Sequence, residues 1–468
     1  MNHQTVKGEL YFEIIREPLF RGVEIPATLQ DSPGTGYAWL GRLRVIADLH
    51  IHSRFSRATS QSMNLEEIDR YAQIKGLSVV GTGDFTHPLW MSELKTKLEM
   101  VDEGGLYALR SGSRRVNFMM TAEVSTIFEF QGKTRKVHHV ILSPSIEVAE
   151  QISDRLRKFG DLTADGRPTL KVTPPELVDL VMEASSANLI FPAHAWTPWF
   201  SVLAANFGFD NVEDCYRDAS DKIFALETGL SSDPRMNWRL SRLDRYTLIS
   251  NSDSHSAWPW RIGREANVFE LRKVTFNEIT DAIRKKDSGR LRFTIETDPA
   301  YGKYHWTGHR NCGVSMPPRE AIAVKNICPK CHRPLTRGVE QRVEELSDRP
   351  EGYRPQGVPG FVCLLPLSEL IAAALNVEQL SSPRVWQVYN RLVSKFGSEY
   401  DVLLYSKPEV LREDAEGDLV DAILRVREGR VKVTPGYDGV YGRIEIFPCG
   451  RGSRERGAKS DSGLDQFI

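Results

Sequence analysis

The chain has 468 residues, enough for roughly two or three domains, and its composition (41% hydrophobic, 26% charged, net charge −1) is that of a soluble globular protein. No apolar run approaches the ~20 residues of a membrane span, and the polar start MNHQTVKGEL is not a signal peptide. We therefore expect a cytoplasmic protein, nucleoid-associated if the cell is bacterial, with no membrane partner. The near-zero net charge neither supports nor excludes DNA binding, which would need a local basic patch.

Residues 1–42 form an N-terminal extension to which the sequence assigns no role. From 43 to 297, short apolar runs of strand character each end in polar or ionisable residues, and helical signals separate several of them. The runs are RVIADLHIH, LSVVGTGDF, NFMMTAEVS, KVHHVILS, NLIFPAHAW, IFALETGLS and YTLISNSDSH. This alternation predicts an α/β domain with a parallel sheet and chemistry at the C-terminal ends of its strands.

The residue pattern changes after residue 297. Residues 298–345 carry a group of cysteines and histidines, and 346–447 read as a helix-rich domain closed by the hairpin-like VKVTPGYDGVYGRIEIF. The tail, 448–468, has no core pattern and is expected to be disordered. Its last residues, DQFI, faintly resemble a clamp-binding peptide, which leaves a sliding clamp open as a partner.

The strand-like runs share one property, an ionisable side chain at or near the end of each run. His50 and His52 lie on one face of the first run, and two such residues alone would be unremarkable. The full set is Asp48, His50, His52, Asp84, Glu123, His139, His194, Glu227, Asp253 and His255. Buried carboxylates and imidazoles at this density need divalent cations as counter-charge, and the mixed ligands suit Zn, Mn or Fe better than Ca. Two such ions ~3.5–4 Å apart would hold a phosphate and activate water, which predicts phosphoester hydrolysis.

A second cluster lies in the 298–345 segment. His309 and Cys312 form an HxxC pair, Cys328 and Cys331 form a CxxC pair, and fifteen residues separate the pairs. Two chelating pairs at this spacing predict one structural zinc ion, with His305 as an alternative to His309 and His332 as a weaker one. The other cysteines are isolated, which favours a reduced protein over a disulfide scaffold.

DLHIH, TGD at 82–84, Glu123, HHVIL at 138–142, PAH at 192–194 and SDSH at 252–255 resemble the polymerase and histidinol phosphatase (PHP) superfamily. The resemblance implies a distorted seven-stranded, TIM-like β/α barrel with two or three divalent ions, which could be Zn, Mn, Mg or Fe. It makes His50, His52, Asp84, Glu123, His139, His194, Asp253 and His255 metal ligands. His139 is preferred to its rival His138 because it directly precedes the apolar VIL. Glu227 and Asp48 are expected to orient ligands.

The sequence departs from the superfamily pattern in two places. Many members have Asp-His where this chain has Gly83-Asp84, and many have another His where this chain reads RFSRATS, which leaves the third metal open.

From 43 to about 447 the chain more narrowly resembles the endonuclease Q family, in DLHIHSRFSRATS, VVGTGDFTHPLW, FPAHAWTPWF, ALETGLSSDPRMNWRLS, GREAN, GHRNCGVS and ICPKCHRPLTRGVEQRVEELSDRP. That family nicks DNA on the 5′ side of deaminated bases (uracil, hypoxanthine, xanthine) and abasic sites. The resemblance implies a metal-dependent repair endonuclease with lesion-containing DNA as its partner, with Asp253, His194 and Asp84 as catalytic residues.

To reach a deaminated base, such an enzyme should flip it into a pocket. Trp196, Trp199 and Ser231 are candidates to line the pocket, with ordinary packing as the alternative for the tryptophans. Arg57 is a candidate phosphate clamp, with a surface salt bridge as an equal alternative. Beyond the zinc pairs, the residues that could meet phosphates are Lys330, Arg333, Arg337 and Arg342.

Two rival functions stay open. One is a PHP-type phosphoesterase acting on a small phosphomonoester, which would not need the zinc module. The other is a nucleic-acid-binding protein with an inactive site. The presence of all eight candidate ligands disfavours it.

Overall fold

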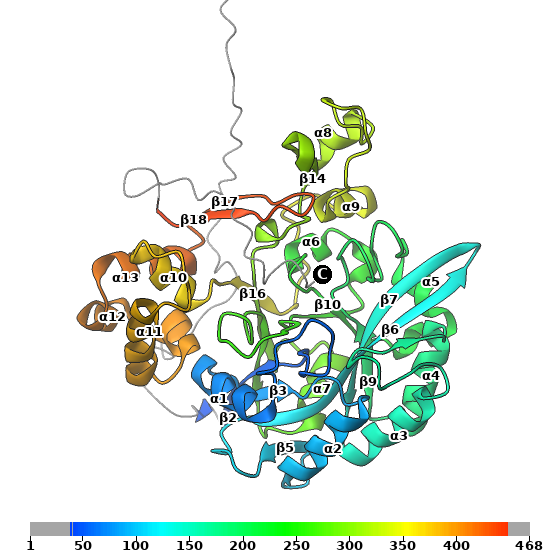
Figure 1. Ribbon diagram of the computed structural model, residues 1–468, viewed down its shortest axis with the longest axis horizontal. Coiled ribbons are helices and arrows are strands. Elements are labelled where there is room, and N and C mark those ends of the chain that lie inside the picture. Colours follow the sequence, from blue (N-terminus) through cyan, green and yellow to red (C-terminus); the bar gives the residue numbers. More distant parts are fainter. Residues whose placement is uncertain (1–37, 40, 448–468) are drawn as a thin grey trace, which may run out of the picture.

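The computed structural model describes residues 38–39 and 41–447. Its centre is a curved sheet with helices around its outside (Figure 1). The strands of this part are β1 (Ala38–Trp39), β2 (Arg42–Asp48), β3 (Val79–Gly81), β4 (Leu98–Val101), β5 (Leu106–Leu109), β6 (Asn117–Phe130), β7 (Lys133–Ser143), β8 (Thr169–Leu170), β9 (Leu189–Pro192), β10 (Ala225–Glu227), β11 (Thr247–Ile249), β12 (Ala266–Leu271) and β13 (Leu291–Glu296). The helices are α1 (Leu65–Lys75), α2 (Pro88–Lys97), α3 (Ile146–Leu156), α4 (Pro174–Ala184), α5 (Val212–Tyr216), α6 (Pro234–Trp238) and α7 (Phe276–Arg284).

Seven strands form a ring in the order β2, β3, β6, β7, β9, β10, β11. Between β9 and β10 the amide of Ala195 donates to the carbonyl of Glu227 at 2.9 Å. The ring closes where Ile51, just beyond β2, pairs with Ser254, just beyond β11. Each of the apolar runs supplies one of these strands, so the distorted seven-stranded barrel predicted from the sequence is confirmed.

One strand of the barrel is antiparallel, although the sequence predicted a parallel sheet. β7 is antiparallel to both of its neighbours, β6 and β9. A two-residue turn joins β6 to β7, and both of its residues, Gln131 and Gly132, have positive φ (51° and 71°), as the favoured hairpin turn requires. The N-terminal half of β7 therefore lies beside the C-terminal half of β6, at the end of the barrel where the parallel strands terminate.

The barrel has an apolar interior and a helix-covered exterior. The alternating residues Val140 and Leu142 of β7 belong to the interior cluster, whereas Ile141 belongs to the cluster that packs against the helices. Helix α1 begins with a capped turn, in which the side chain of Asn64 accepts from the amide of Glu67 at 3.0 Å.

The zinc-module segment contains β14 (Thr307–His309), β15 (Val314–Met316), α8 (Pro318–Ala323) and α9 (Val339–Leu346). The C-terminal region contains β16 (Gly360–Cys363), α10 (Leu367–Ala374), α11 (Pro383–Phe396), α12 (Pro408–Asp414), α13 (Gly417–Arg427), β17 (Lys432–Thr434) and β18 (Arg443–Glu445). The predicted closing hairpin is β17–β18, and it contacts the zinc module, because the amide of Trp306 donates to Gly436 and that of Arg310 to Asp438. No helix in the described part of the chain is long and apolar enough to cross a bilayer.

β16 lies in the barrel sheet although it follows the zinc module in sequence. It pairs in parallel with β13, from Phe293 opposite Gly360 to Glu296 opposite Cys363. Two parallel neighbours need a crossover connection, and here the crossover contains the whole zinc module. The predicted domain limits of 43–297, 298–345 and 346–447 remain predictions. The N-terminal extension except for 38–39 and 41–42, and the tail 448–468, lie outside the described residues.

Candidate metal centre

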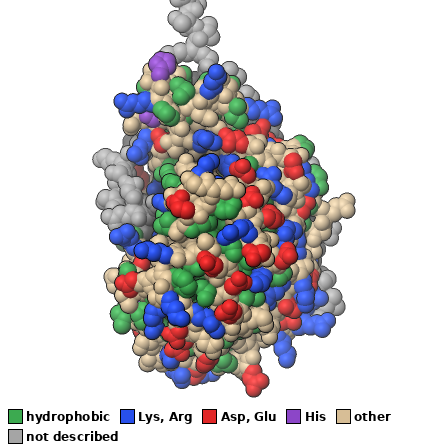
Figure 2. Space-filling view, turned by 90° about the vertical axis from the view of Figure 1, so that its right-hand side faces the viewer, with side chains coloured by type: hydrophobic (Ala, Val, Ile, Leu, Met, Phe, Trp, Pro, Cys, Tyr) green, Lys and Arg blue, Asp and Glu red, His purple; other side chains and the backbone are tan. Residues whose placement is uncertain are grey.

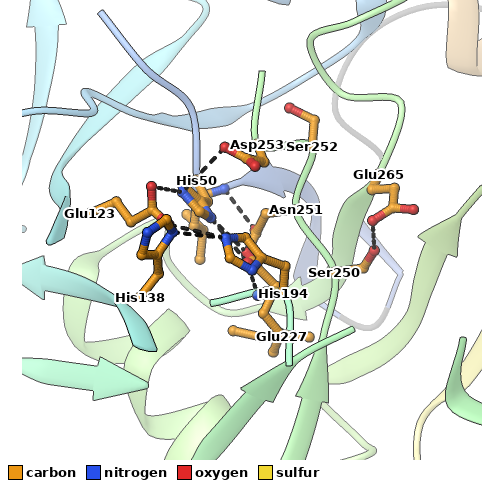
Figure 3. A network of polar contacts seen from close by, with 12 residues as sticks. His50, Glu123, His138, His194, Glu227, Ser250, Asn251, Ser252, Asp253 and Glu265 are labelled. Atoms are coloured by element: carbon orange, nitrogen blue, oxygen red, sulfur yellow. Dashed lines mark hydrogen bonds and ion pairs between the residues drawn. The ribbon is translucent and has the colours of Figure 1, made fainter. Parts of the chain in front are cut away.

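Three buried donors and one half-buried carboxylate converge at the mouth of the barrel, and Figure 3 labels three of them, His50, Glu123 and Asp253. His50, His52, Glu123 and Asp253 each offer one ligand atom, and these atoms all lie within 4.8 Å of one another. His52 Nε2 is 3.0 Å from Asp253 Oδ1 and 3.2 Å from Glu123 Oε2. His50 Nε2 is 3.6 Å from Asp253 Oδ1 and 3.7 Å from Glu123 Oε2.

A second group shares Glu123 with the first. It consists of Glu123, His138 and His194, whose ligand atoms also lie within 4.8 Å of one another. Glu123 Oε1 is 2.8 Å from His138 Nδ1 and 3.1 Å from His194 Nε2, while its Oε2 faces His50 and His52. A carboxylate with one oxygen in each donor group is suited to bridge two adjacent metal ions.

The structure corrects the choice between His138 and His139. His138 lies in the second donor group, whereas both ring nitrogens of His139 are engaged elsewhere, by Thr126 at 2.9 Å and by Tyr216 at 2.8 Å. Neighbouring residues of a strand point to opposite faces. Since Val140 faces Glu123 across the β6–β7 pair, His138 shares the face of Glu123 and His139 points toward the helices.

Asp84 does not join either donor group. Its Oδ1 accepts from His52 Nδ1 at 3.0 Å, and its Oδ2 accepts from the amide and the hydroxyl of Ser53, each at 2.6 Å. The structure therefore differs from the prediction of Asp84 as a metal ligand and catalytic residue: this carboxylate lies behind His52 and turns Nε2 toward the centre.

Glu227 and Asp48 hold the centre in the way expected of them. Glu227 accepts from His50 Nδ1 at 3.0 Å and from the amide of His194 at 2.8 Å, which aims His50 Nε2 at the carboxylates. Asp48 accepts from the amides of Ser252 and Gly263, which fixes the SDSH loop. Such partners fix the orientation of metal-binding imidazoles.

His255 lies at the edge of the centre, outside both donor groups. Its ring is 4.4 Å from the ring of His52, and its Nδ1 is 2.9 Å from the carbonyl oxygen of Asp253. Burial lowers the pKa of His255 to about 4. The neutral imidazole faces His52, in a place from which it can complete the coordination of an ion at the mouth.

Three of the predicted site residues have a left-handed backbone. Asp84, His194 and Asp253, each beyond the end of a barrel strand, have φ of 49°, 28° and 48°. For a residue with a Cβ this conformation is strained, and strain of this kind persists where the surrounding structure enforces it, often at functional sites. The strain marks the strand ends as the functional mouth of the barrel.

Opposing effects act on the ionisation of the donors. Burial alone would lower the pKa of His50, but Glu227, Asp253 and Glu123 raise it well above its usual value. Burial alone would raise the pKa of Glu123, but its contacts with His138, Arg167 and His50 hold it well below its usual value. Burial lowers the pKa of His138 to about 4, so its imidazole is neutral at pH 7 and able to bind a metal ion.

The donor set fits divalent ions. His50 Nε2 is buried and has no hydrogen-bond partner in the described structure, although two carboxylates face it. Two ligands bound ~2.1 Å from one ion lie ~3–3.5 Å apart, close to the spacings around Glu123 and Asp253. Imidazole and carboxylate together suit Zn, Mn or Fe, whose identity and number stay open.

The polar network continues away from the mouth to two buried acids. Asn251 donates to Glu227 at 2.7 Å, and the hydroxyl of Ser250 lies 3.1 Å from Glu265 and 3.0 Å from Glu296 (Figure 3). Burial raises the pKa of Glu265 to about 8 and that of Glu296 well above its usual value. Burial thus favours the protonated form of both carboxyl groups.

Arg167 contacts the centre and was missed by sequence reasoning. Its Nη1 is 3.2 Å from Glu123 Oε2, and its side chain is 27% exposed. Burial would lower its pKa, but Glu123, Asp253 and Asp165 raise it. Arg167 lies in the loop between α3 and α4, two residues before the short strand β8, so no periodic pattern pointed to it.

The predicted substrate-binding residues separate into two kinds. Trp196 is a core residue, 1% exposed, whose Nε1 donates to Asn237 at 2.8 Å, which contradicts its assignment to a pocket. Arg57 is exposed, whereas Trp199 and Ser231 are half-buried. These three residues stay accessible to a ligand.

The predicted basic residues of the zinc module mostly have protein partners. Arg342 donates to Asp210 at 2.6 Å and to two carbonyls, Arg337 pairs with Glu345, and Lys330 donates to the carbonyl of Cys312. Arg333 is exposed. On the face shown in Figure 2, Lys and Arg are interspersed with Asp and Glu, and form no continuous basic surface.

The four predicted zinc ligands come together. His309, at the end of β14, Cys312, Cys328 and Cys331 each offer one atom, all within 4.8 Å of one another. His305 instead pairs with Glu340 at 3.7 Å, and His332 is exposed. Three thiols and one imidazole are a ligand set typical of structural zinc.

The fold and the centre together define a PHP-type barrel protein. Comparison with solved structures then identifies the family within this class of barrel proteins. The chain is similar to the lesion-specific endonuclease PfuEndoQ from Pyrococcus furiosus, with 34% identity over 86% of this chain and 95% of that one and a TM-score of 0.77. It is equally similar, at 34% identity over 86% of this chain and 96% of that one and a TM-score of 0.75, to endonuclease Q in complex with a 27-mer duplex carrying an abasic lesion at the active site. The chain belongs to the endonuclease Q family.

The curated relatives are uncharacterized proteins. One from Bacillus subtilis, YqxK, is 26% identical over 86% of this chain and 99% of its own length. One from Methanocaldococcus jannaschii, MJ0043, is 31% identical over 260 residues, 54% of this chain, and this chain spans about a third (32%) of its length. A model of the MJ0043 C-terminal domain matches residues 366–430, which contain α10 to α13.

Proposed function

We propose that the protein is a metal-dependent DNA repair endonuclease that cuts the phosphodiester on the 5′ side of deaminated bases (uracil, hypoxanthine, xanthine) and abasic sites. One observation carries the proposal: two adjoining groups of metal donors that share Glu123 lie in a chain 34% identical, over 86% of its length, to a lesion-specific endonuclease. A related structure holds duplex DNA with an abasic lesion at its active site.

The residues around Glu123 would hold the metal ions. When bound, such ions supply hydroxide near neutral pH and neutralise charge on the scissile phosphate. Glu227 and Asp84 keep His50 and His52 oriented with Nε2 toward the centre. Asp253 is the residue we expect to be indispensable, since its Oδ1 faces both imidazoles at the open side.

Lesion recognition would require the base to leave the duplex. Deamination weakens base pairing and so lowers the cost of flipping. Half-buried Ser231, in the loop after β10, is our candidate to read the O4 or O6 carbonyl of the base, and Trp199 is a candidate stacking surface. If Ser231→Ala cut uracil and thymine substrates with unchanged selectivity, the Ser231 assignment would be wrong.

A nicking assay tests the function. A labelled duplex with a single deoxyuridine is incubated with manganese or magnesium and the wild type or Asp253→Ala, beside an undamaged duplex. We expect the wild type alone to cut, immediately 5′ of the deoxyuridine. Cleavage elsewhere or an active Asp253→Ala enzyme would contradict the proposal, and turnover of p-nitrophenyl phosphate without nicking would favour the small-molecule phosphatase.

A further inference from the structure

Arg167 is brought to the metal centre by a loop that is anchored on both sides. The loop lies between α3 and α4. The amide of Gly166 donates to the carbonyl of Phe55 at 3.0 Å, and the amide of Ser125 donates to the carbonyl of Pro168 at 2.9 Å. β8, which begins at the next residue, pairs with β6. Because backbone contacts flank Arg167, its guanidinium is positioned by the fold and not by its own flexibility.

The loop approaches the centre so closely that only glycine fits next to Arg167. A Cβ on Gly166 would lie 2.4 Å from Asp84 Oδ2 and 2.4 Å from the hydroxyl oxygen of Ser56. Asp165 fixes the turn, since its Oδ1 accepts from the amides of Arg57 and Arg167 at 3.0 and 3.1 Å. Arg57, the phosphate clamp suggested by the sequence, thus contributes its backbone to the loop that carries Arg167.

The exposure of Arg167 distinguishes it from a counter-ion for Glu123. A guanidinium has five N–H donors in a planar fork that matches phosphate oxygens. The contact of Nη1 with Glu123 uses part of this fork, and the side chain is 27% exposed at a centre where Asp253 is also 28% exposed. A residue that only neutralised Glu123 would need no access to solvent.

We propose that Arg167 is a catalytic residue that donates hydrogen bonds to a non-bridging oxygen of the scissile phosphate, an assignment that rests on the proposed function. Charge on the phosphoryl oxygens is stabilised in the transition state by pre-positioned cations such as an Arg clamp. Arg167 keeps its proton throughout. The attacking oxygen forms a bond to phosphorus, the bond to the leaving 3′ oxygen breaks, and Arg167 stays hydrogen-bonded to an oxygen that remains on phosphorus.

The first experiment compares Arg167→Met and Arg167→Lys with Arg157→Met, a matched control on an exposed arginine that pairs only with Asp154 at the end of α3. Single-turnover nicking of the deoxyuridine duplex should fall about 10²–10³-fold in Arg167→Met, the usual effect of removing one transition-state donor. Arg167→Lys should lose less, and Arg157→Met nothing. Metal content, measured by elemental analysis, should equal that of the wild type in all three variants. A loss of metal that parallels the loss of rate would show that Arg167 acts through Glu123 and would overturn the assignment.

The second experiment uses sulfur in place of each non-bridging oxygen of the scissile phosphate. If Arg167 contacts one of these oxygens, sulfur at that position should slow the wild type more than Arg167→Met, because the contact is already lost in the variant. Equal slowing of both enzymes by both diastereomers would refute the contact. If the wild type does not nick the duplex at all, the proposed function is wrong, and the Arg167 comparison with bis(p-nitrophenyl) phosphate then decides the assignment separately.

Discussion

A buried ion pair joins the barrel to the C-terminal helices. Lys75, the last residue of α1, places its Nζ 2.8 Å from Glu399 Oε1 and 2.8 Å from the carbonyl oxygen of Pro259, with the Lys75 and Glu399 side chains 2% and 0% exposed. Glu399 also accepts from the amide of Leu367 at 3.0 Å and from the hydroxyl of Tyr389 at 2.6 Å. The pair therefore fixes α10 and α11 against α1 and the loop that follows the SDSH motif.

Lys75→Met keeps the apolar stem but leaves the Glu399 carboxylate buried without a cation. Removal of one partner from a buried pair costs about 3–5 kcal/mol, whereas an exposed pair contributes at most about 1 kcal/mol. Since two neutral donors remain on Glu399, we expect a loss of about 3 kcal/mol. Lys75→Met combined with Glu399→Gln should recover most of it, because no unpaired charge is left.

Hydrogen exchange of the α10 and α11 amides measures this loss locally. A loss of 3 kcal/mol should speed their exchange on the order of 100-fold. Lys95→Met is the matched control, because Lys95 pairs with Glu150 at the same 2.8 Å but the side chains are 51% and 39% exposed. The reasoning fails if Lys75→Met exchanges no faster than Lys95→Met, or if the double variant is as unstable as Lys75→Met alone.

Further predictions concern the site and its surroundings. Gly166→Ala, whose Cβ would lie 2.4 Å from two side-chain oxygens, should slow nicking at least ~10-fold, whereas Gly417→Ala, with nothing within 4 Å, should not; equal rates would refute the close approach. His138→Ala should lower the metal content, whereas His139→Ala should keep the metal and lower the Tm; the reverse result would restore His139 as the ligand. Glu265, with its pKa raised to about 8, binds its proton more tightly in the folded protein, so stability should fall as pH rises from about 4.5 to 8. Glu265→Gln should flatten this fall in urea unfolding, and an unchanged slope would exclude Glu265 as its source.

The positions of most donors could be predicted because they follow from strand ends. His50, His52, His194 and Asp253 each lie just past a strand of the barrel, Glu123 lies within β6, and the structure brings their ligand atoms together. Local patterns define where strands end, and the barrel then makes those ends converge.

The register of β7 against β6 was the missing information at His138 and His139. Both residues precede the same apolar run, and the pairing of Val140 with Glu123 puts His138, not His139, on the face that carries the donors. The turn at Gln131 and Gly132, both with positive φ, joins the two strands into the hairpin that sets this register. Arg167 depends on a loop that no periodicity describes.

The pairing of β16 with β13 bears on how this protein can be cut into parts. A fragment that ends at residue 297 would retain β13 but lose the strand that covers its outer side. The unpaired backbone donors and acceptors of β13 would then be able to pair with a second copy of the fragment. Such pairing between exposed edge strands is a usual cause of aggregation. During synthesis on the ribosome the chain passes through the same state, and β13 remains an unpaired edge strand until residues 360–363 have emerged. A soluble catalytic fragment should therefore extend through Cys363 or carry a charged substitution on β13.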